Sequence, residues 1–176
     1  MSKQKGYIMN APKLEDYVES YINGDESSFD VIYEQTSKIV YLSIFTIIKN
    51  KTLIEDIMQD TYLKAINSLN YYKKGTNFSA WIATIARNQA INVYNKRKRE
   101  TLVDPVEGLS LFESPVEGSS LLNKALSILE GTEKDIIIYH IVLNFKFKDI
   151  ANILDIPLST VFFIYKKAIS KIKKEV

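Results

Sequence analysis

Asparagine recurs on one side of a segment with helical spacing between residues 77 and 99. Asn88, Asn92 and Asn95 follow one another at intervals of four and three, so they share a helix face. Asparagine is a mediocre helix former, but its amide both donates to and accepts from base edges. The pattern therefore indicates a helix face that could contact nucleic acid. The polar residues on or beside this face are Thr84, Arg87, Asn88, Asn92, Asn95, Lys98 and Arg99.

Two tyrosines and two lysines lie in the loop directly before this helix, in the run Asn70-Tyr-Tyr-Lys-Lys-Gly-Thr-Asn77. An aromatic ring next to a cation is suited to stacking an unpaired base beside its phosphate. Tyrosines at a helix end are also commonly packed into a core, and the loop sequence alone leaves both possibilities open.

A stripe of acidic and amide side chains follows one side of the preceding helical segment, which starts near Leu53. Asp56, Gln59, Asp60 and Leu63 share this side, and we call them the acidic stripe. The other side carries core residues, namely Ile54, Ile57, Met58, Thr61 and Ala65. Such a stripe is either plain solvated surface or the polar rim and apolar centre of a protein interface, and physical reasoning alone favours surface.

The C-terminal part has the spacing of a helix-turn-helix between Lys148 and Val161. Ala151 is small where the two helices would cross, and Asp155 stands where the turn often needs a left-handed backbone. The last helix ends in a basic set that could neutralise phosphates, although the helix dipole alone also favours lysine there. We favour DNA binding over simple packing of short helices. The basic set is Lys166, Lys167, Lys171, Lys173 and Lys174.

Composition excludes several classes of site. The chain has no cysteine and one histidine, so thiol nucleophiles, disulfides and multi-histidine metal centres are excluded. Its net charge of +2 does not by itself indicate nucleic acid. Neither a secretory signal nor an apolar run long enough for a bilayer span is apparent, and no catalytic motif is visible. We expect a cytoplasmic, non-enzymatic protein without cofactor, metal or small-molecule substrate.

These residues must be positioned by helices, because apolar residues recur at intervals of three and four and no segment alternates with a period of two. The predicted fold class is all-α, with two small helical domains joined by an acidic linker: residues 1–100, linker 101–120, and a helix-turn-helix domain at 121–176. We expect few contacts between the two domains. Thr52, Asn77, Thr132 and Ser159 are the expected helix caps. Helices are predicted near 12–22, 26–49, 53–70, 77–99, 121–130, 133–144, 147–154 and 159–174.

Three motifs in this order resemble a known family. The run Ile54-Glu-Asp-Ile-Met-Gln-Asp-Thr-Tyr-Leu-Lys-Ala65, then Phe78-Ser-Ala-Trp-Ile-Ala-Thr-Ile-Ala-Arg-Asn88, then Lys96-Arg-Lys-Arg99, resembles region two of bacterial sigma factors. With the linker and the run Ile156-Pro-Leu-Ser-Thr-Val161, the chain resembles the extracytoplasmic-function group (group four) over nearly everything after residue 25.

The resemblance implies roles for the polar residues. In relatives the helix that carries the acidic stripe docks on the clamp helices of the RNA polymerase largest subunit, which implicates Asp56, Gln59, Asp60 and Leu63. The loop and following helix capture an unpaired minus-ten base and line the promoter, and the last helix reads the minus-thirty-five element. The implicated DNA-binding residues are Tyr72, Lys73, Asn77, Arg87, Asn88, Asn92, Ser159, Thr160, Phe162, Phe163, Lys166 and Lys167.

The same resemblance implies the partners: RNA polymerase core, through the clamp helices and the beta flap, promoter DNA, and in many relatives an anti-sigma factor. One departure stands out, because Phe162-Phe-Ile164 replaces a stretch that normally includes a basic DNA contact. Phenylalanine can touch thymine methyl groups but cannot read guanine as arginine does, unless the rings pack inward against residues 136–143. Two alternatives stay open, namely a helix-turn-helix regulator that acts without polymerase, and a polymerase-binding adaptor with weakened promoter reading.

Overall fold

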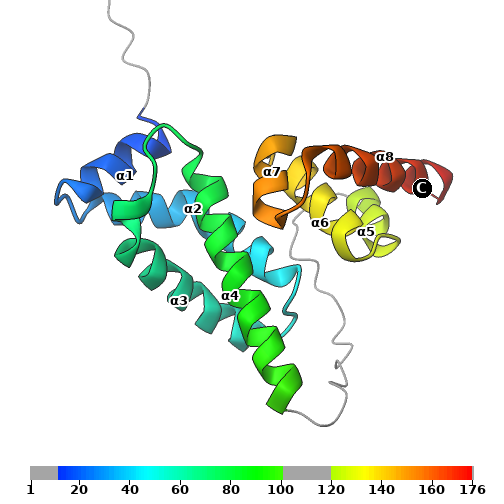
Figure 1. Ribbon diagram of the computed structural model, residues 1–176, viewed down its shortest axis with the longest axis horizontal. Coiled ribbons are helices and arrows are strands. Elements are labelled where there is room, and N and C mark those ends of the chain that lie inside the picture. The colour runs from blue at the N-terminus through cyan, green and yellow to red at the C-terminus, as the bar shows by residue number, and fades with distance from the viewer. Residues whose placement is uncertain (1–11, 101–119, 176) are drawn as a thin grey trace, which may run out of the picture.

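In the computed structural model, residues 12–100 and 120–175 are described, and these residues form helices and no strand (Figure 1). The all-α class is therefore confirmed. No described helix is both long and apolar enough to cross a membrane. The α-helices are α1 (Leu14–Ile22), α2 (Ser28–Phe45), α3 (Lys51–Asn67), α4 (Phe78–Glu100), α5 (Ser120–Ser127), α6 (Gly131–Ile137), α7 (Phe147–Leu154) and α8 (Leu158–Glu175), with a 3₁₀ turn at Leu69–Tyr71 and a π-helical turn at Ile138–Val142.

The N-terminal helices α1 to α4 pack around one apolar core, and α4 lies against both α2 and α3 (Figure 1). Residues spaced by four place Phe78, Ile82, Ala86 and Ala90 on one side of α4, and all four are fully buried or nearly so. Because this side is apolar along four turns, α4 is held firmly while its other sides remain available for contacts.

The starts of α3 and α4 test two of the predicted helix caps. Asn77 caps α4, because its Oδ1 accepts a hydrogen bond from the Ala80 N–H at 3.2 Å, as expected. The predicted cap Thr52 is wrong, since α3 begins earlier and Asn50 Oδ1 accepts from the Leu53 N–H at 3.0 Å. Because Asn50 caps the helix in place of Thr52, α3 starts two residues earlier than predicted.

The two C-terminal caps are also wrong. Helix α6 begins at Gly131, whose φ of +50° is in the left-handed region, so Thr132 already lies inside the helix. Helix α8 begins at Leu158, directly after Pro157, which leaves Ser159 in the first turn. The Pro157 carbonyl oxygen accepts the first helical hydrogen bond, from the Val161 N–H at 3.1 Å, so Pro157 takes the cap position that was predicted for Ser159.

The helix-turn-helix is present as predicted. Helices α7 and α8 are joined at Asp155, which adopts the left-handed conformation with φ 53° and ψ 47°. Ala151 is buried in the same cluster as Ile150 and Val161, at the crossing of the two helices. The expectation for Asp155 is confirmed, since aspartate tolerates this backbone better than most residues.

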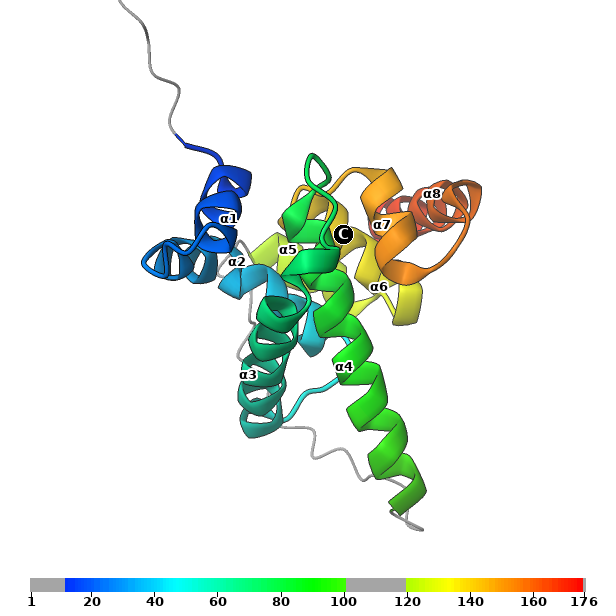
Figure 2. The same cartoon turned by 60° about the vertical axis from the view of Figure 1, so that its left-hand side comes forward.

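The expectation of few contacts between the two halves of the chain is wrong. Ala80 and Ala83 of α4 are buried together with Ile136, Tyr139 and Ile150 in one apolar cluster. A second cluster joins α2 to α5, α6 and α8, and both views show α7 alongside α4 (Figures 1 and 2). Alanine side chains let α7 approach α4 closely. Residues 101–119 of the predicted linker lie outside the described residues, whereas its last residue, Ser120, begins α5. The proposed domain limits stay a prediction.

Candidate nucleic-acid interface

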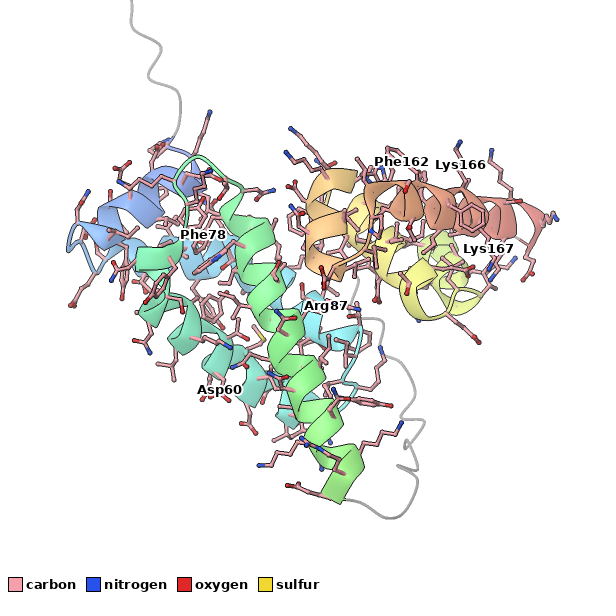
Figure 3. The ribbon with its side chains drawn as sticks, viewed as in Figure 1. Asp60, Phe78, Arg87, Phe162, Lys166 and Lys167 are labelled. Carbon is pink, nitrogen blue, oxygen red and sulfur yellow. The ribbon has the colours of Figure 1, made fainter. Side chains whose placement is uncertain are left out.

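The acidic stripe lies on the solvent side of α3. Asp56, Gln59 and Asp60 are exposed, and Leu63 is 60% exposed. Figure 3 shows Asp60 on the side of α3 away from the C-terminal helices. The opposite side of the helix is buried, so α3 presents an apolar side chain among acidic and amide groups on a rigid support.

The two tyrosines of the loop before α4 differ in burial. Tyr72 is 8% exposed, and its hydroxyl donates to the Thr76 carbonyl oxygen at 2.5 Å. Its ring meets Phe78 edge to face, with centroids 5.2 Å apart, and also contacts Trp81. Burial raises the pKa of the Tyr72 phenol. In this arrangement Tyr72 is a packing residue and its ring is not accessible to a base.

Tyr71 is the accessible aromatic of the loop, with 86% of its surface exposed. Lys73 beside it is also exposed, whereas Lys74 forms an ion pair with Glu19 at 2.5 Å. Sequence reasoning singled out the loop but favoured the other tyrosine. Two adjacent aromatics cannot both face one core, and only the packing of Phe78 and Trp81 decides which one is buried.

The asparagine face of α4 is solvent-exposed at Asn88, Asn92 and Asn95, as the spacing predicts. Asn77, at the start of the helix, has a second role besides capping, because its Nδ2 donates to Asp149 Oδ2 of α7 at 3.1 Å. The structure therefore brings Asn88 and Asn92 together on one open face and turns Asn77 toward α7.

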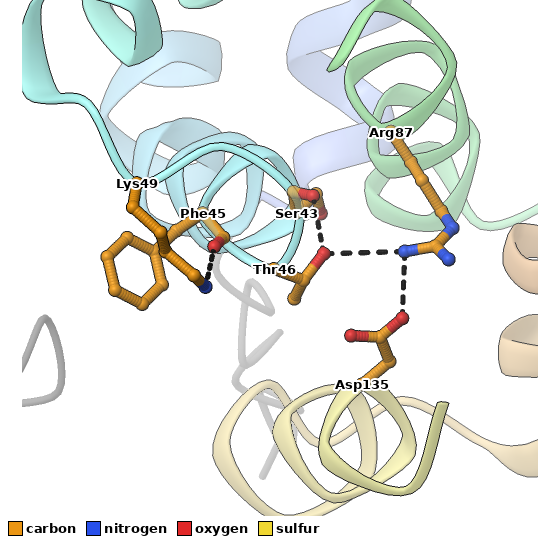
Figure 4. Close-up of polar contacts among 6 residues, drawn as sticks. All are labelled: Ser43, Phe45, Thr46, Lys49, Arg87 and Asp135. Atoms are coloured by element: carbon orange, nitrogen blue, oxygen red, sulfur yellow. Dashed lines mark hydrogen bonds and ion pairs between the residues drawn. The ribbon is translucent and has the colours of Figure 1, made fainter. Parts of the chain in front are cut away.

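Arg87 is not free on this surface. Its Nη1 lies 3.0 Å from Asp135 Oδ2 of α6 and donates to Thr46 Oγ1 at 3.3 Å (Figure 4). The ion pair is largely buried, with 16% of the arginine side chain and 9% of the aspartate side chain exposed. Figure 3 shows Arg87 on the side of α4 that faces the C-terminal helices.

The Arg87–Asp135 ion pair lies in a largely apolar environment. Burial raises the pKa of Asp135, while the Arg87 charge opposes that rise. Burial also raises the pKa of the neighbouring Tyr139 to about 12, against the opposing effect of the nearby Ser43 and Arg87 side chains. Within the described part of the chain, the Tyr139 hydroxyl has no hydrogen bond of good geometry. Sequence reasoning missed Asp135 and Tyr139, because a single acid and a single tyrosine on a helix carry no spacing signal.

The rings of α8 point outward. Phe162 is 42% exposed and Phe163 is 70% exposed, so the inward packing against residues 136–143 is not observed. The Phe162 ring instead rests against Phe147, with centroids 4.6 Å apart. Ser159 is exposed beside these rings and Thr160 is half-buried.

The lysines of α8 divide into two groups. Lys166 is exposed on the same side as Phe162, whereas Lys167 lies on another side of the helix (Figure 3). Lys167 and Lys171 both pair with the buried Glu133 of α6, at 3.1 and 2.5 Å. The Lys171 hydrogen bond, more than any other contact, holds the pKa of Glu133 below its usual range. Lys167 is therefore tied to α6, which the sequence did not reveal.

The sigma-70 region 2 family matches residues 32–100, which include the acidic stripe, the tyrosine loop and the asparagine face. The chain is 25% identical to the ECF RNA polymerase sigma factor SigX of Bacillus subtilis over 63% of this chain and 57% of SigX. It is 30% identical to SigM of the same organism over 59% of this chain and 63% of SigM. These matches span between half and two thirds of the relatives' length.

Solved structures extend the likeness to the fold of both halves. CnrH in complex with the cytosolic domain of CnrY superposes with a TM-score of 0.65 at 15% identity, covering 91% of this chain and 94% of that chain. The sigma factor RpoE in complex with the anti-sigma factor NepR from Bartonella quintana gives a TM-score of 0.61 at 22% identity, covering 82% and 95%. Residues 32–100 belong to the sigma-70 region 2 family, and the curated relatives that the chain matches are extracytoplasmic-function sigma factors.

Region 2 of the chain comprises the two surfaces that the sequence singled out. The acidic stripe on α3 and the asparagine face on α4 are both exposed. Two implicated residues, Asn77 and Arg87, instead contact the C-terminal helices of the same chain.

Proposed function

We propose that this chain binds RNA polymerase core, directs it to promoters and aids strand opening, while all chemistry belongs to the polymerase. The region 2 match, with its acidic stripe and asparagine face both exposed on rigid helices, is the observation that carries the proposal. A protein with this role works in the cytoplasm, where the polymerase is found.

The acidic stripe is the proposed contact with the clamp helices of the largest subunit. Its centre is Leu63, and the polar anchors around it are Asp56, Gln59 and Asp60. An exposed leucine inside a polar rim has the layout of a protein interface, in which the central apolar residue is desolvated on binding. The C-terminal helices are the proposed contact with the beta flap of the polymerase.

The loop and α4 are the proposed reader of the melted minus-ten element. Tyr71, Lys73, Asn88 and Asn92 are exposed and lie on or just before α4. Flipping a base out of a duplex costs a few kcal/mol of free energy, and stacking on an aromatic ring offsets this cost by about 1–3 kcal/mol per base. Tyr71 therefore takes the stacking role that the resemblance assigned to Tyr72.

Helix α8 is the proposed reader of the minus-thirty-five element. Phe162 is held by Phe147, with Ser159 and Lys166 exposed beside it. An aromatic ring can contact thymine methyl groups, a hydroxyl can bond to a base edge or phosphate, and the lysine can neutralise a phosphate. We propose that this helix prefers thymine-rich sequence, and that the exposed Phe163 extends the apolar contact.

An anti-sigma factor is a further proposed partner. Both structural neighbours described above are complexes, one with the cytosolic domain of CnrY and one with the anti-sigma factor NepR. Their likeness to this chain covers 91% and 82% of it.

Run-off transcription with purified polymerase core and a pool of duplex promoters tests the proposal. We expect transcripts that start at specific positions only when both core and this protein are present. Duplex DNA binding by the protein alone would indicate a conventional regulator. Core binding without specific transcripts would indicate an adaptor. Either result would contradict the proposal.

Strand opening is tested separately with the double variant Tyr71→Ala and Asn88→Ala. We expect unchanged assembly with core, reduced transcription from duplex DNA, and partial rescue on a template with a pre-melted minus-ten bubble. Tyr71→Phe is the matched control, because it keeps the stacking ring, and it should transcribe normally. Loss of core binding in the double variant would contradict base capture.

A further inference from the structure

One ring of α8 is held at the surface by three other rings. The Phe162 ring contacts the Phe147 ring of α7 with centroids 4.6 Å apart, and Phe147 in turn stacks on His140 with centroids 4.1 Å apart. Tyr165, one turn further along α8, contacts both His140 and Phe147. We call these four residues the aromatic stack. Phe162 is its outer end, on the part of α8 nearest to α7 (Figure 3).

The base of the aromatic stack is fixed by its own contacts. His140 lies in the π-helical turn Ile138–Val142, and its Nδ1 donates to the Phe145 carbonyl oxygen at 2.9 Å, since a carbonyl oxygen can only accept. The His140 and Phe147 rings are within 27° of parallel, and Tyr165 meets His140 edge to face at 87°. These three rings are half-buried. The ring on which Phe162 rests therefore has little freedom to move.

The outer end of the stack is both held and accessible. Phe162 is 42% exposed, although one part of its ring rests on Phe147. The next residue differs, because Phe163 is 70% exposed and lines a separate hollow with Lys167 and Lys171. A side chain that is already ordered loses less rotamer freedom on binding than a free one. Phe162 is therefore the ring of α8 that is prepared for a directed contact.

The side chains around Phe162 suit a DNA duplex better than a protein. Leu158 and Lys166 lie one turn before and one turn after Phe162 on the same side of α8, and both are exposed, as is Ser159. Lysine is depleted at the centres of protein interfaces but is a common phosphate contact. The major groove is about 12 Å wide and admits an α-helix. An apolar ring between a hydroxyl and a cation fits this groove.

From this geometry we propose that Phe162 reads the 5-methyl group of one thymine in the minus-thirty-five element. Phe147, seated on His140, is the positioning residue that sets the Phe162 ring for this contact. The inference rests on the proposed function and deepens it, from a general preference for thymine-rich sequence to one methyl group that is read by one supported ring.

The chemistry of the base edges explains why the methyl group is the target. In the major groove it is the apolar group, whereas adenine, guanine and cytosine present hydrogen-bonding atoms. A phenyl ring has no donor or acceptor, so it leaves those atoms unpaired but can bury the methyl group. Deoxyuridine has the hydrogen-bonding edge of thymine without the methyl group. Burying one methyl-sized group corresponds to about a fourfold change in affinity.

Promoter duplexes that differ only in this methyl group test the inference. One duplex carries thymine and the other deoxyuridine throughout the minus-thirty-five segment of a promoter selected from the run-off pool. Each is titrated with the complete complex of polymerase core and the full-length chain. We expect the parent to bind the thymine duplex about fourfold more tightly. Phe162→Ala should bind both duplexes equally, and it should keep the fold because Phe162 lies at the surface.

Changes beneath Phe162 test the positioning role. Phe147→Leu stays apolar but removes the ring, and His140→Gln keeps an N–H for the Phe145 carbonyl oxygen but removes the seat. Both variants should lose the preference for thymine, whereas Phe147→Tyr keeps the ring and should retain it. Phe163→Leu is the matched control, because it makes the same substitution outside the stack, and it should also retain the preference. A merely structural role would weaken binding of both duplexes equally, and circular dichroism checks that each variant keeps its helices.

The possible results separate the inference from the proposed function. Equal binding of both duplexes by the parent would overturn methyl reading, and it is the result expected if this surface meets a protein instead. A preference retained in Phe162→Ala would also overturn it. A preference retained in Phe147→Leu and His140→Gln, or lost in Phe163→Leu, would overturn the positioning role. If the parent with core binds neither duplex, the proposed function itself fails and the inference falls with it.

Discussion

Leu63→Ala is expected to weaken core binding without affecting the fold. Fully burying a leucine side chain is worth about 1.5–3 kcal/mol. Leu63 is 60% exposed in the free protein, so docking can still bury roughly that share, and the substitution should cost about 1–2 kcal/mol of binding. This corresponds to an increase in Kd of about 5-fold to 30-fold. The unfolding free energy should change by less than about 0.5 kcal/mol, because the side chain is at the surface.

The measurement is calorimetric titration of the variant against a fragment of the polymerase largest subunit that contains the clamp helices. Leu121→Ala is the matched control, because Leu121 is the same residue type and is 62% exposed on α5. It should bind the fragment like the parent. An unchanged Kd for Leu63→Ala, or an equal loss for Leu121→Ala, would refute the assignment of the acidic stripe as this interface.

Three further predictions concern stability and can be checked by urea unfolding. Tyr139→Phe removes a buried hydroxyl without a hydrogen bond and should raise the unfolding free energy by about 1 kcal/mol, and a decrease would mean that the hydroxyl has a partner. Asn77→Ala removes the α4 cap and the bond to Asp149, and should cost at least about 1 kcal/mol, whereas no loss would argue against the cap. The pKa of Glu133 is lowered from its ordinary value of 4.5, chiefly by Lys171, so its pairing stabilises the fold above that pH and is lost as the pH falls through the lowered pKa. Glu133→Gln should therefore flatten the pH dependence of stability in this acidic range, and an unchanged profile would show that the pairing contributes little.

Local sequence patterns predicted most of the secondary structure of this protein. The three-and-four spacing located each helix, and the ends shifted where a better cap was available, as with Asn50 in place of Thr52. The left-handed turn at Asp155 and the Asn77 cap were also predictable, because both depend on one residue and its immediate backbone. The exposed asparagine face and the acidic stripe follow from the same periodicity, since the apolar side of each helix determines which side remains in solvent.

Tertiary packing decided which functional side chains are accessible. Tyr71 and Tyr72 are chemically identical neighbours, and only the positions of Phe78 and Trp81 determine that Tyr72 is buried. The contact between the two halves was likewise invisible in the sequence, because Ala83 is a good helix former in any environment and its burial is known only once the C-terminal helices are in place. Arg87 and Asp135 are 48 residues apart in the numbering of the chain, and no local periodicity relates residues so far apart. Periodicity specifies one helix at a time, whereas the partner of a charged side chain depends on how separate helices meet.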